Sequence, residues 1–170
     1  GEVRGELEPC GCPTLPYGGF VRRENLLHEL RAQKTTFHLE AGELLLKGFY
    51  SNKGEDAQKR ARLLSLLSQK VGVDVWTVGP TDVMALGIQE LQTVKGPPRI
   101  SATWLDEQGE WLFDPFIVLE RSNIRLAVIG LSAEPTDPKW QTQIKMLDAN
   151  TAISKVLPLL PPDVDLIIAL

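Results

Sequence analysis

The stretches that decide the fold are Gly18-Gly19-Phe20-Val21-Arg22-Arg23, Leu39-Glu40-Ala41-Gly42-Glu43 and Asp74-Val75-Trp76-Thr77-Val78-Gly79-Pro80-Thr81-Asp82. In the first, a Gly-Gly loop precedes a basic amphipathic helix. That helix leads to a β-prone run that ends in Ala-Gly-acid. The third stretch repeats the design of a strand followed by an acidic loop. The acidic loops are therefore the first place to look for functional residues.

The composition is that of an ordinary globular protein. The 170 residues fit one domain or a large piece of one, and 43% are hydrophobic and 24% charged. A net charge of −4 argues against a nucleic-acid partner, because phosphate binding needs a basic face. The longest apolar runs, such as Leu166–Leu170, fall far short of the ~20 residues of a membrane span. The chain opens at Gly1 without a visible signal peptide, which is compatible with a leader that has been removed.

Helical and β-prone patterns alternate along the chain, which predicts an α/β fold. Apolar spacings of three and four predict helices that start after Gly19, cover about 56–71 and 86–94, and start again after Asp148 or Asn150. β-prone runs predict strands over 35–39, 73–78, 99–104, 116–119, 125–131 and 166–170. The last of these is expected to be buried, and Ser122-Asn123 is expected to form a turn. Residues 1–170 are interpreted as one domain or the N-terminal part of one.

The two cysteines, Cys10 and Cys12, are separated by one residue in a loop rich in Gly and Pro. Two cysteines do not make a disulfide framework. They could form a strained local disulfide, bind a soft metal or contact a cofactor, or remain a free dithiol. With only His28 and His38 available in addition, a closed structural zinc site is not expected. We favour a local redox or binding role over a disulfide staple.

Six segments appear in an order and spacing that resemble the N-terminal half of the metallophosphatase (calcineurin-like phosphoesterase) domain of the 5'-nucleotidase family. They are Gly18–Arg23, Leu39–Glu43, Val78–Asp82, Ser101-Ala102, Leu126–Leu131 and Asp165–Ala169. The run Leu7-Glu8-Pro9-Cys10-Gly11-Cys12 further resembles a bacterial secreted subgroup of that family. The resemblance implies a sandwich of mixed sheets flanked by helices. It also implies an incomplete domain, without the first strand and the C-terminal ligand loops, and a periplasmic or secreted location.

Several positions depart from the two-metal site that the resemblance implies. Glu2 stands in place of an Asp ligand and Arg4 in place of a His ligand, and an arginine cannot lose its proton to bind a cation. Glu43 replaces the Asp that bridges both metals. Pro80 replaces an Asn ligand, and Thr81 replaces the catalytic His. A site of this kind needs close geometric control, which the longer Glu side chain disturbs.

The candidate metal ligands that remain are Glu2, Glu43 and Asp82. Each has a simpler interpretation as well: Glu43 as a carboxylate that caps a loop, and Asp82 as a helix cap. Arg22 and Arg23 form either a solvated basic face or a weak phosphate-binding site near a helix N-terminus.

The favoured function is that of a degenerate 5'-nucleotidase-like module with a binding, assembly or redox-associated role. Its partner would be another protein, for instance a redox protein that uses Cys10 and Cys12. No cofactor is firmly predicted for this function. The alternative is an active metal-dependent phosphoesterase that hydrolyses nucleotides or other phosphate esters, with its remaining ligands outside these residues. In that case the cofactor is manganese, zinc or magnesium, and Glu43 bridges two ions.

Overall fold

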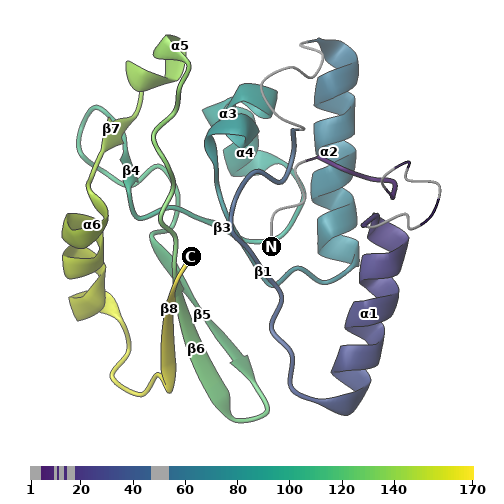
Figure 1. The fold of residues 1–170 in the computed structure, drawn as a ribbon. Helices are drawn as coiled ribbons and strands as arrows, with labels where there is room; N and C mark the ends of the chain where they lie inside the picture. Colours follow the sequence, from purple (N-terminus) through teal and green to yellow (C-terminus); the bar gives the residue numbers. More distant parts are fainter. Residues whose placement is uncertain (1–4, 10, 12–13, 15–17, 47–53) are drawn as a thin grey trace.

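The structure is a computed structural model that describes residues 5–9, 11, 14, 18–46 and 54–170 (Figure 1). Its first sheet is parallel and has the order β1-β2-β3, with β1 at Leu39–Glu40, β2 at Val75–Thr77 and β3 at Arg99–Ile100. Helix α1 (Phe20–Gln33) precedes this sheet, and α2 (Glu55–Lys70) connects β1 to β2. Helices α3 (Pro80–Leu86) and α4 (Ile88–Thr93) connect β2 to β3. Parallel neighbours need such crossover connections.

The second large sheet has the order β5-β6-β8 and is mixed. Strands β5 (Phe116–Arg121) and β6 (Ile124–Ile129) are antiparallel, whereas β8 (Leu166–Ala169) runs parallel to β6. A smaller antiparallel pair joins β4 (Trp104–Leu105) to β7 (Lys145–Met146). Helix α5 (Pro138–Gln141) precedes β7, and α6 (Ala149–Val156) with the 3-10 turn Leu157–Leu159 leads to β8. No helix in the described part of the chain is both long and apolar enough to cross a membrane.

The two larger sheets meet where β3 ends. Ala102 N donates to Gly130 O at 2.7 Å, and Ser101 N donates to Asp114 O at 2.9 Å. A Cβ atom at Gly130 would lie 2.8 Å from the backbone of Ile100, so only glycine permits this close approach. The arrangement confirms the predicted α/β class with mixed sheets and flanking helices.

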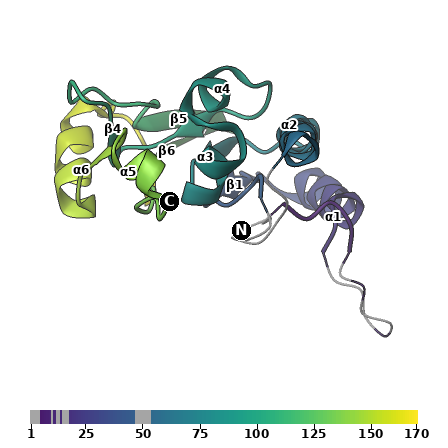
Figure 2. The same ribbon diagram turned by 90° about the horizontal axis from the view of Figure 1, so that it is seen from above.

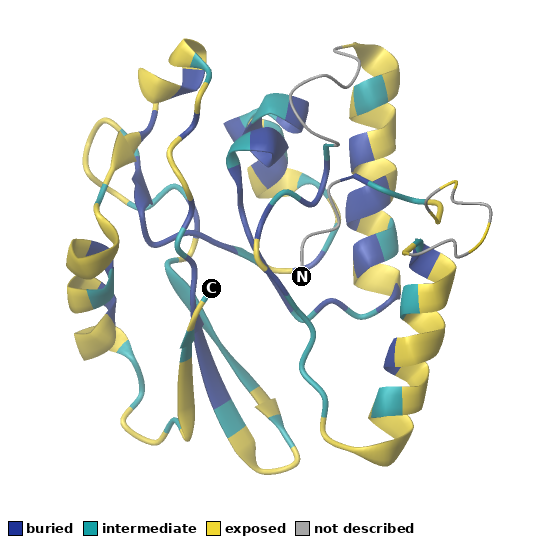
Figure 3. Ribbon diagram, viewed as in Figure 1, coloured by how far each residue is buried: buried dark blue, intermediate teal, exposed yellow. Residues whose placement is uncertain are grey.

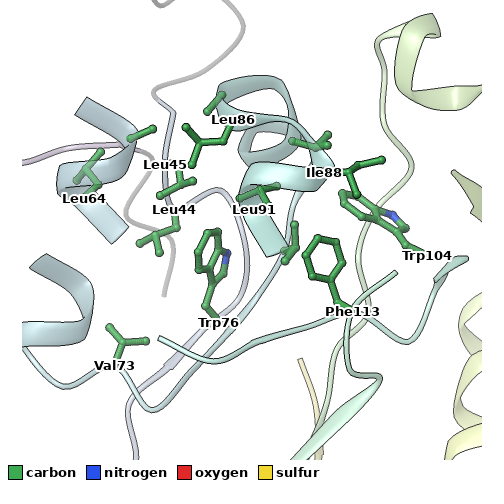
Figure 4. Close-up of a cluster of buried hydrophobic side chains, with 14 of the residues drawn as sticks. Leu44, Leu45, Leu64, Val73, Trp76, Leu86, Ile88, Leu91, Trp104 and Phe113 are labelled. Atoms are coloured by element: carbon green, nitrogen blue, oxygen red, sulfur yellow. The ribbon is translucent and has the colours of Figure 1, made fainter. Parts of the chain in front are cut away.

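The main core lies between the parallel sheet and the helices that connect its strands (Figure 4). Trp76 is fully buried and packs in one cluster with Leu44, Leu45, Leu64 and Leu91. Burial colouring shows that α2 turns one buried stripe inward, whereas most of α1 is exposed (Figure 3). Trp76 lies in β2, shortly before α3, and packs in the same cluster as Leu44 and Leu45 of the loop after β1. Its large buried ring therefore helps to position the loops that follow the first two strands.

Several predicted elements are confirmed and others differ in extent. The helices after Gly19 and over about 56–71 are present, and Asp148 accepts a hydrogen bond from Thr151 N as the N-cap of α6. Ser122 and Asn123 form the expected turn with positive φ. The strand predicted over 35–39 is present but displaced to Leu39–Glu40, because His38 N bonds the Asp74 side chain and strand pairing starts only at Leu39. The predicted strand over 99–104 is split into β3 and β4.

The prediction of a buried C-terminal strand is wrong within the described chain. Leu166 is 53% exposed and Ile167 is 44% exposed. The reason is topological, since among the described residues β8 pairs only with β6 and its other edge has no neighbouring strand. An apolar run alone does not distinguish a central strand from an edge strand.

The Gly18-Gly19 loop has the backbone that the sequence predicted. Gly18 has φ of 77° and Gly19 has φ of 86°. A Cβ atom on Gly19 would also lie 2.8 Å from Pro9 Cδ, whereas one on Gly18 would meet nothing within 4 Å. Both positions therefore require positive φ, and Gly19 additionally has no room for a side chain beside Pro9.

Gly19→Val is expected to lower the free energy of unfolding by about 1 kcal/mol or more, because valine is strained at positive φ and clashes with Pro9. The matched control is Gly18→Val, which has the same strain without the clash. Thermal melting should show the larger loss for Gly19→Val. Equal melting temperatures for the two variants would contradict the contact with Pro9.

Candidate functional site

The loops that follow β1 and β2 lie against each other at the carboxyl ends of these strands. A Cβ atom on Gly79 would lie 2.9 Å from Glu43 N and 3.0 Å from Glu43 Oε1, so the second loop approaches the first as closely as glycine allows. Thr81 N donates to Glu43 Oε1 at 3.5 Å, and Glu43 has φ of 53°, in the left-handed region. The structure thus brings Glu43 and the Gly79–Asp82 loop together.

Asp82 ties these two loops to each other. Its Oδ1 accepts a hydrogen bond from Leu45 N at 2.8 Å, and its Oδ2 accepts from Gly79 N at 2.8 Å and from Trp76 Nε1 at 3.1 Å. The side chain is fully buried. A carboxylate has about four acceptor positions, and three are used here by groups of the chain itself. Asp82 is therefore both the cap of α3 and the link between the loops after β1 and β2.

The environment of Asp82 acts on its protonation in two opposing ways. The pKa of Asp82 is raised to about 7; burial is the largest cause, and the nearby Glu43 also acts to raise it. The hydrogen bonds from Gly79, Leu45 and Trp76 favour the ionised form and lower the pKa, but burial is the larger effect. Asp82 consequently differs from an ordinary surface carboxylate.

Hydroxyl groups line the same edge of the fold. Thr77 Oγ1 donates to Leu170 O at 3.4 Å, which brings the ends of β2 and β8 together. Ser132 Oγ donates to Ser101 Oγ at 2.8 Å across the junction of the sheets. Thr81 is buried, and its hydroxyl has no hydrogen-bond partner among the described residues. Sequence reasoning missed Thr77 and Ser132, because hydroxyl residues carry no signal without a motif.

The donor set in the described residues does not fit two metal ions. No three His, Cys, Asp or Glu residues gather there in a group that could hold a metal. Pro80 offers no side-chain donor, and Thr81 offers only a neutral hydroxyl. Glu43 is half-buried, and Asp82 already accepts the hydrogen bonds described above. That Glu43 and Asp82 are ligands stays a prediction.

Other predicted site residues lie outside the described part of the chain. Glu2, Arg4, Cys10 and Cys12 are among them. Their proposed roles as metal ligand, ligand replacement and redox pair stay predictions.

The two arginines of α1 have different surroundings. Arg22 is exposed, whereas Arg23 is half-buried and forms an ion pair with the buried Glu40. The guanidinium of Arg23 is thus engaged inside the fold, and Arg22 alone retains the exposed position that the weak phosphate-binding prediction needs.

Asp82→Asn should reveal the protonation of this group. Because the pKa of Asp82 in the folded protein is raised to about 7, from about 3.9 in an unfolded chain, its contribution to stability is complete below about pH 4 and is lost as the pH rises through about 7. The free energy of unfolding of wild type minus that of Asp82→Asn should therefore decrease from pH 4 to pH 8, as measured by urea titration. Because both proteins contain the same other carboxylates, the effects of those groups on stability cancel when the two are compared at the same pH. If this difference instead increased with pH, the three N–H donors would have a larger effect on the pKa of Asp82 than burial has.

The comparisons with known proteins point to one family. No family model matches the chain. A curated 5'-nucleotidase from Vibrio parahaemolyticus serotype O3:K6 is 27% identical over 157 residues, which is 82% of this chain and 26% of the relative. The chain thus spans about a quarter of the length of the curated relatives it matches.

Solved structures share the fold. The 5'-nucleotidase precursor from Thermus thermophilus superposes with a TM-score of 0.72 at 21% identity, over 99% of this chain and 35% of that one. A calcineurin-like phosphoesterase from Bacillus subtilis gives a TM-score of 0.72 at 16% identity, over 99% of this chain and 58% of that one. The chain is thus similar in sequence to part of curated 5'-nucleotidases, and it shares its fold with part of a 5'-nucleotidase precursor and of a calcineurin-like phosphoesterase.

Proposed function

We propose that this chain is a degenerate module of the 5'-nucleotidase family that acts in binding or assembly and does not hold a two-metal centre. The observation that carries the proposal is the bonding of Asp82. Its carboxylate is buried and accepts hydrogen bonds from Leu45 N, Gly79 N and Trp76 Nε1. An internal carboxylate thus links two loops that, in a two-metal enzyme, a metal ion would hold together.

The residue types around Asp82 support the same proposal. A two-metal phosphatase stabilises both the attacking and the leaving oxygen of an in-line displacement, which requires two ions at fixed positions. Arg4, Pro80 and Thr81 stand at positions where the resemblance implies ligands or a catalytic histidine. Glu43 is the one acid at the described edge that keeps partial exposure, and a single carboxylate does not make a two-metal site.

The second candidate function is active metal-dependent phosphoester hydrolysis. It is favoured by the curated relatives, which are 5'-nucleotidases and of which the chain spans only 26%. Ligands from polypeptide outside these 170 residues would then complete the site around Glu43. The substrate class under this alternative is a nucleotide or another phosphate ester.

The proposed location is periplasmic or secreted. The Thermus relative is a precursor, and the resemblance of the Leu7–Cys12 run to a secreted subgroup points the same way. In such a location Cys10 and Cys12 would serve a redox partner, a soft metal or a cofactor.

Metal content tests the main proposal. Protein purified in the presence of manganese or zinc should contain less than two equivalents of tightly bound metal per chain by elemental analysis, since the described donors are too few. Glu43→Gln is the matched variant and should leave the metal content unchanged. Two equivalents in wild type that are lost in Glu43→Gln, together with phosphatase turnover, would establish the second candidate instead.

Replacement of both cysteines by serine tests the redox proposal. A disulfide between Cys10 and Cys12 would close a very small, strained ring, so the pair should be easily reduced. We expect titratable thiols in wild type and an unchanged melting temperature in the double variant. A large fall in melting temperature, with no titratable thiol in wild type, would identify a structural staple.

A further inference from the structure

Helix α1 is held on the domain by few apolar contacts. Of its 14 residues only Phe20 and Leu27 are buried. Val21 is 72% exposed and Leu26 is 55% exposed, so the apolar residues of α1 are distributed around the helix. Viewed from above, α1 lies at the side of the domain, beside α2 (Figure 2). Hydrophobic burial on its own therefore defines the position of α1 poorly.

A buried polar cluster connects α1 to β1. Arg23 of α1 forms an ion pair through Nη2 with Oε1 of Glu40, at the end of β1. His38 Nε2 lies 2.6 Å from Arg23 Nη2 and 2.9 Å from Glu40 Oε1. Glu40 is 1% exposed. The three side chains thus connect α1 to β1, with Arg23 and His38 separated by 15 positions in the chain.

The charges in this cluster are largely desolvated. Burial lowers the pKa of Arg23 to about 10, which leaves the guanidinium charged at neutral pH. Burial, and then the positive charge of Arg23, lower the pKa of His38 to about 4, so the imidazole is neutral. Arg31 also lowers the pKa of His38, and Asp74, which is paired with Arg121, raises it. The attraction in the cluster is therefore that of Arg23 for Glu40.

The hydrogen bonds of the cluster are incomplete. A neutral imidazole can use Nε2 to accept from Arg23 or to donate to Glu40, but not for both. Arg23 Nη1, His38 Nδ1 and Glu40 Oε2 are buried without a partner among the described residues. Such a cluster adds little net stability, although removal of one charged partner is costly because it leaves the other buried and unpaired. Its main effect is then to select one position of α1.

We propose that Arg23, His38 and Glu40 form an internal clamp that sets the docked position of α1, and that α1 leaves the domain as a unit when the clamp loses one charge. This device is independent of the function proposed above. It also has a consequence for the candidate site, because Glu40 directly precedes the Ala41-Gly42-Glu43 loop. The docking of α1 and the geometry of the loop that carries Glu43 therefore share one anchor.

Amide hydrogen exchange with mass spectrometry tests the clamp. In Glu40→Gln and in Arg23→Met, amides of α1 should exchange about a hundredfold faster than in wild type, whereas amides of α2 should be unchanged. Arg22→Met is the matched control, because it removes an exposed arginine one residue away on the same helix. Unchanged exchange in α1, or equal acceleration in α1 and α2, would overturn the proposal, since the first denies the clamp and the second denies separate release.

A double variant separates lost charge pairing from lost packing. Arg23→Met combined with Glu40→Met removes both charges and keeps apolar volume, so α1 exchange should return to within about tenfold of wild type. Exchange as fast as in the single variants would show that the unpaired charge is not what releases α1, and would overturn the mechanism.

Discussion

The carboxylate of Asp82 is the interaction on which the arrangement of the candidate site depends. It accepts hydrogen bonds from Leu45 N, which is 37 residues earlier in the chain, and from Gly79 N and Trp76 Nε1. A buried carboxylate needs such donors, since an unpaired charge inside a protein is very costly. These bonds place the loop after β1 against the loop after β2, and the close approach of Gly79 to Glu43 follows from that placement. The same bonds orient Trp76, around which the main core is packed.

Among the described residues, the loops of the candidate site are joined without a cluster of metal-ligand side chains. A metal ion draws oxygen and nitrogen ligands from several loops to one point, whereas here the loops are joined by hydrogen bonds to one side chain of the chain itself. Glu43 is left at the rim, where it is half-buried and close to Thr81 N. Loops that hydrogen bonds already join would keep their positions without an ion, and could then serve recognition. This is the physical basis for the proposal of a degenerate module.

Two arrangements of charge serve the fold in different ways. Asp82 is surrounded by N–H donors and is well satisfied, so it joins neighbouring loops firmly. The cluster of Arg23, His38 and Glu40 leaves three buried atoms without partners among the described residues, so it specifies position more than it stabilises. The first belongs to the candidate site, and the second lies at the end of β1, where Glu40 is three residues before Glu43. Both act on the short segment from Glu40 to Leu45.

The sequence by itself determined the features that depend only on residues close to one another in the chain. The α/β class, the positive φ of Gly18 and Gly19, the Ser122-Asn123 turn and the Asp148 cap all follow from local propensity and side-chain chemistry. Only the tertiary structure decided that Arg23 pairs with Glu40, that Asp82 accepts a hydrogen bond from Leu45, and that β8 lies at a sheet edge. Each of these depends on which distant segments become neighbours, and neither periodicity nor propensity in one sequence encodes that choice. The candidate site was therefore located from the sequence in outline, at the acidic loops, while the use of each acid was decided by the contacts that folding brings to it.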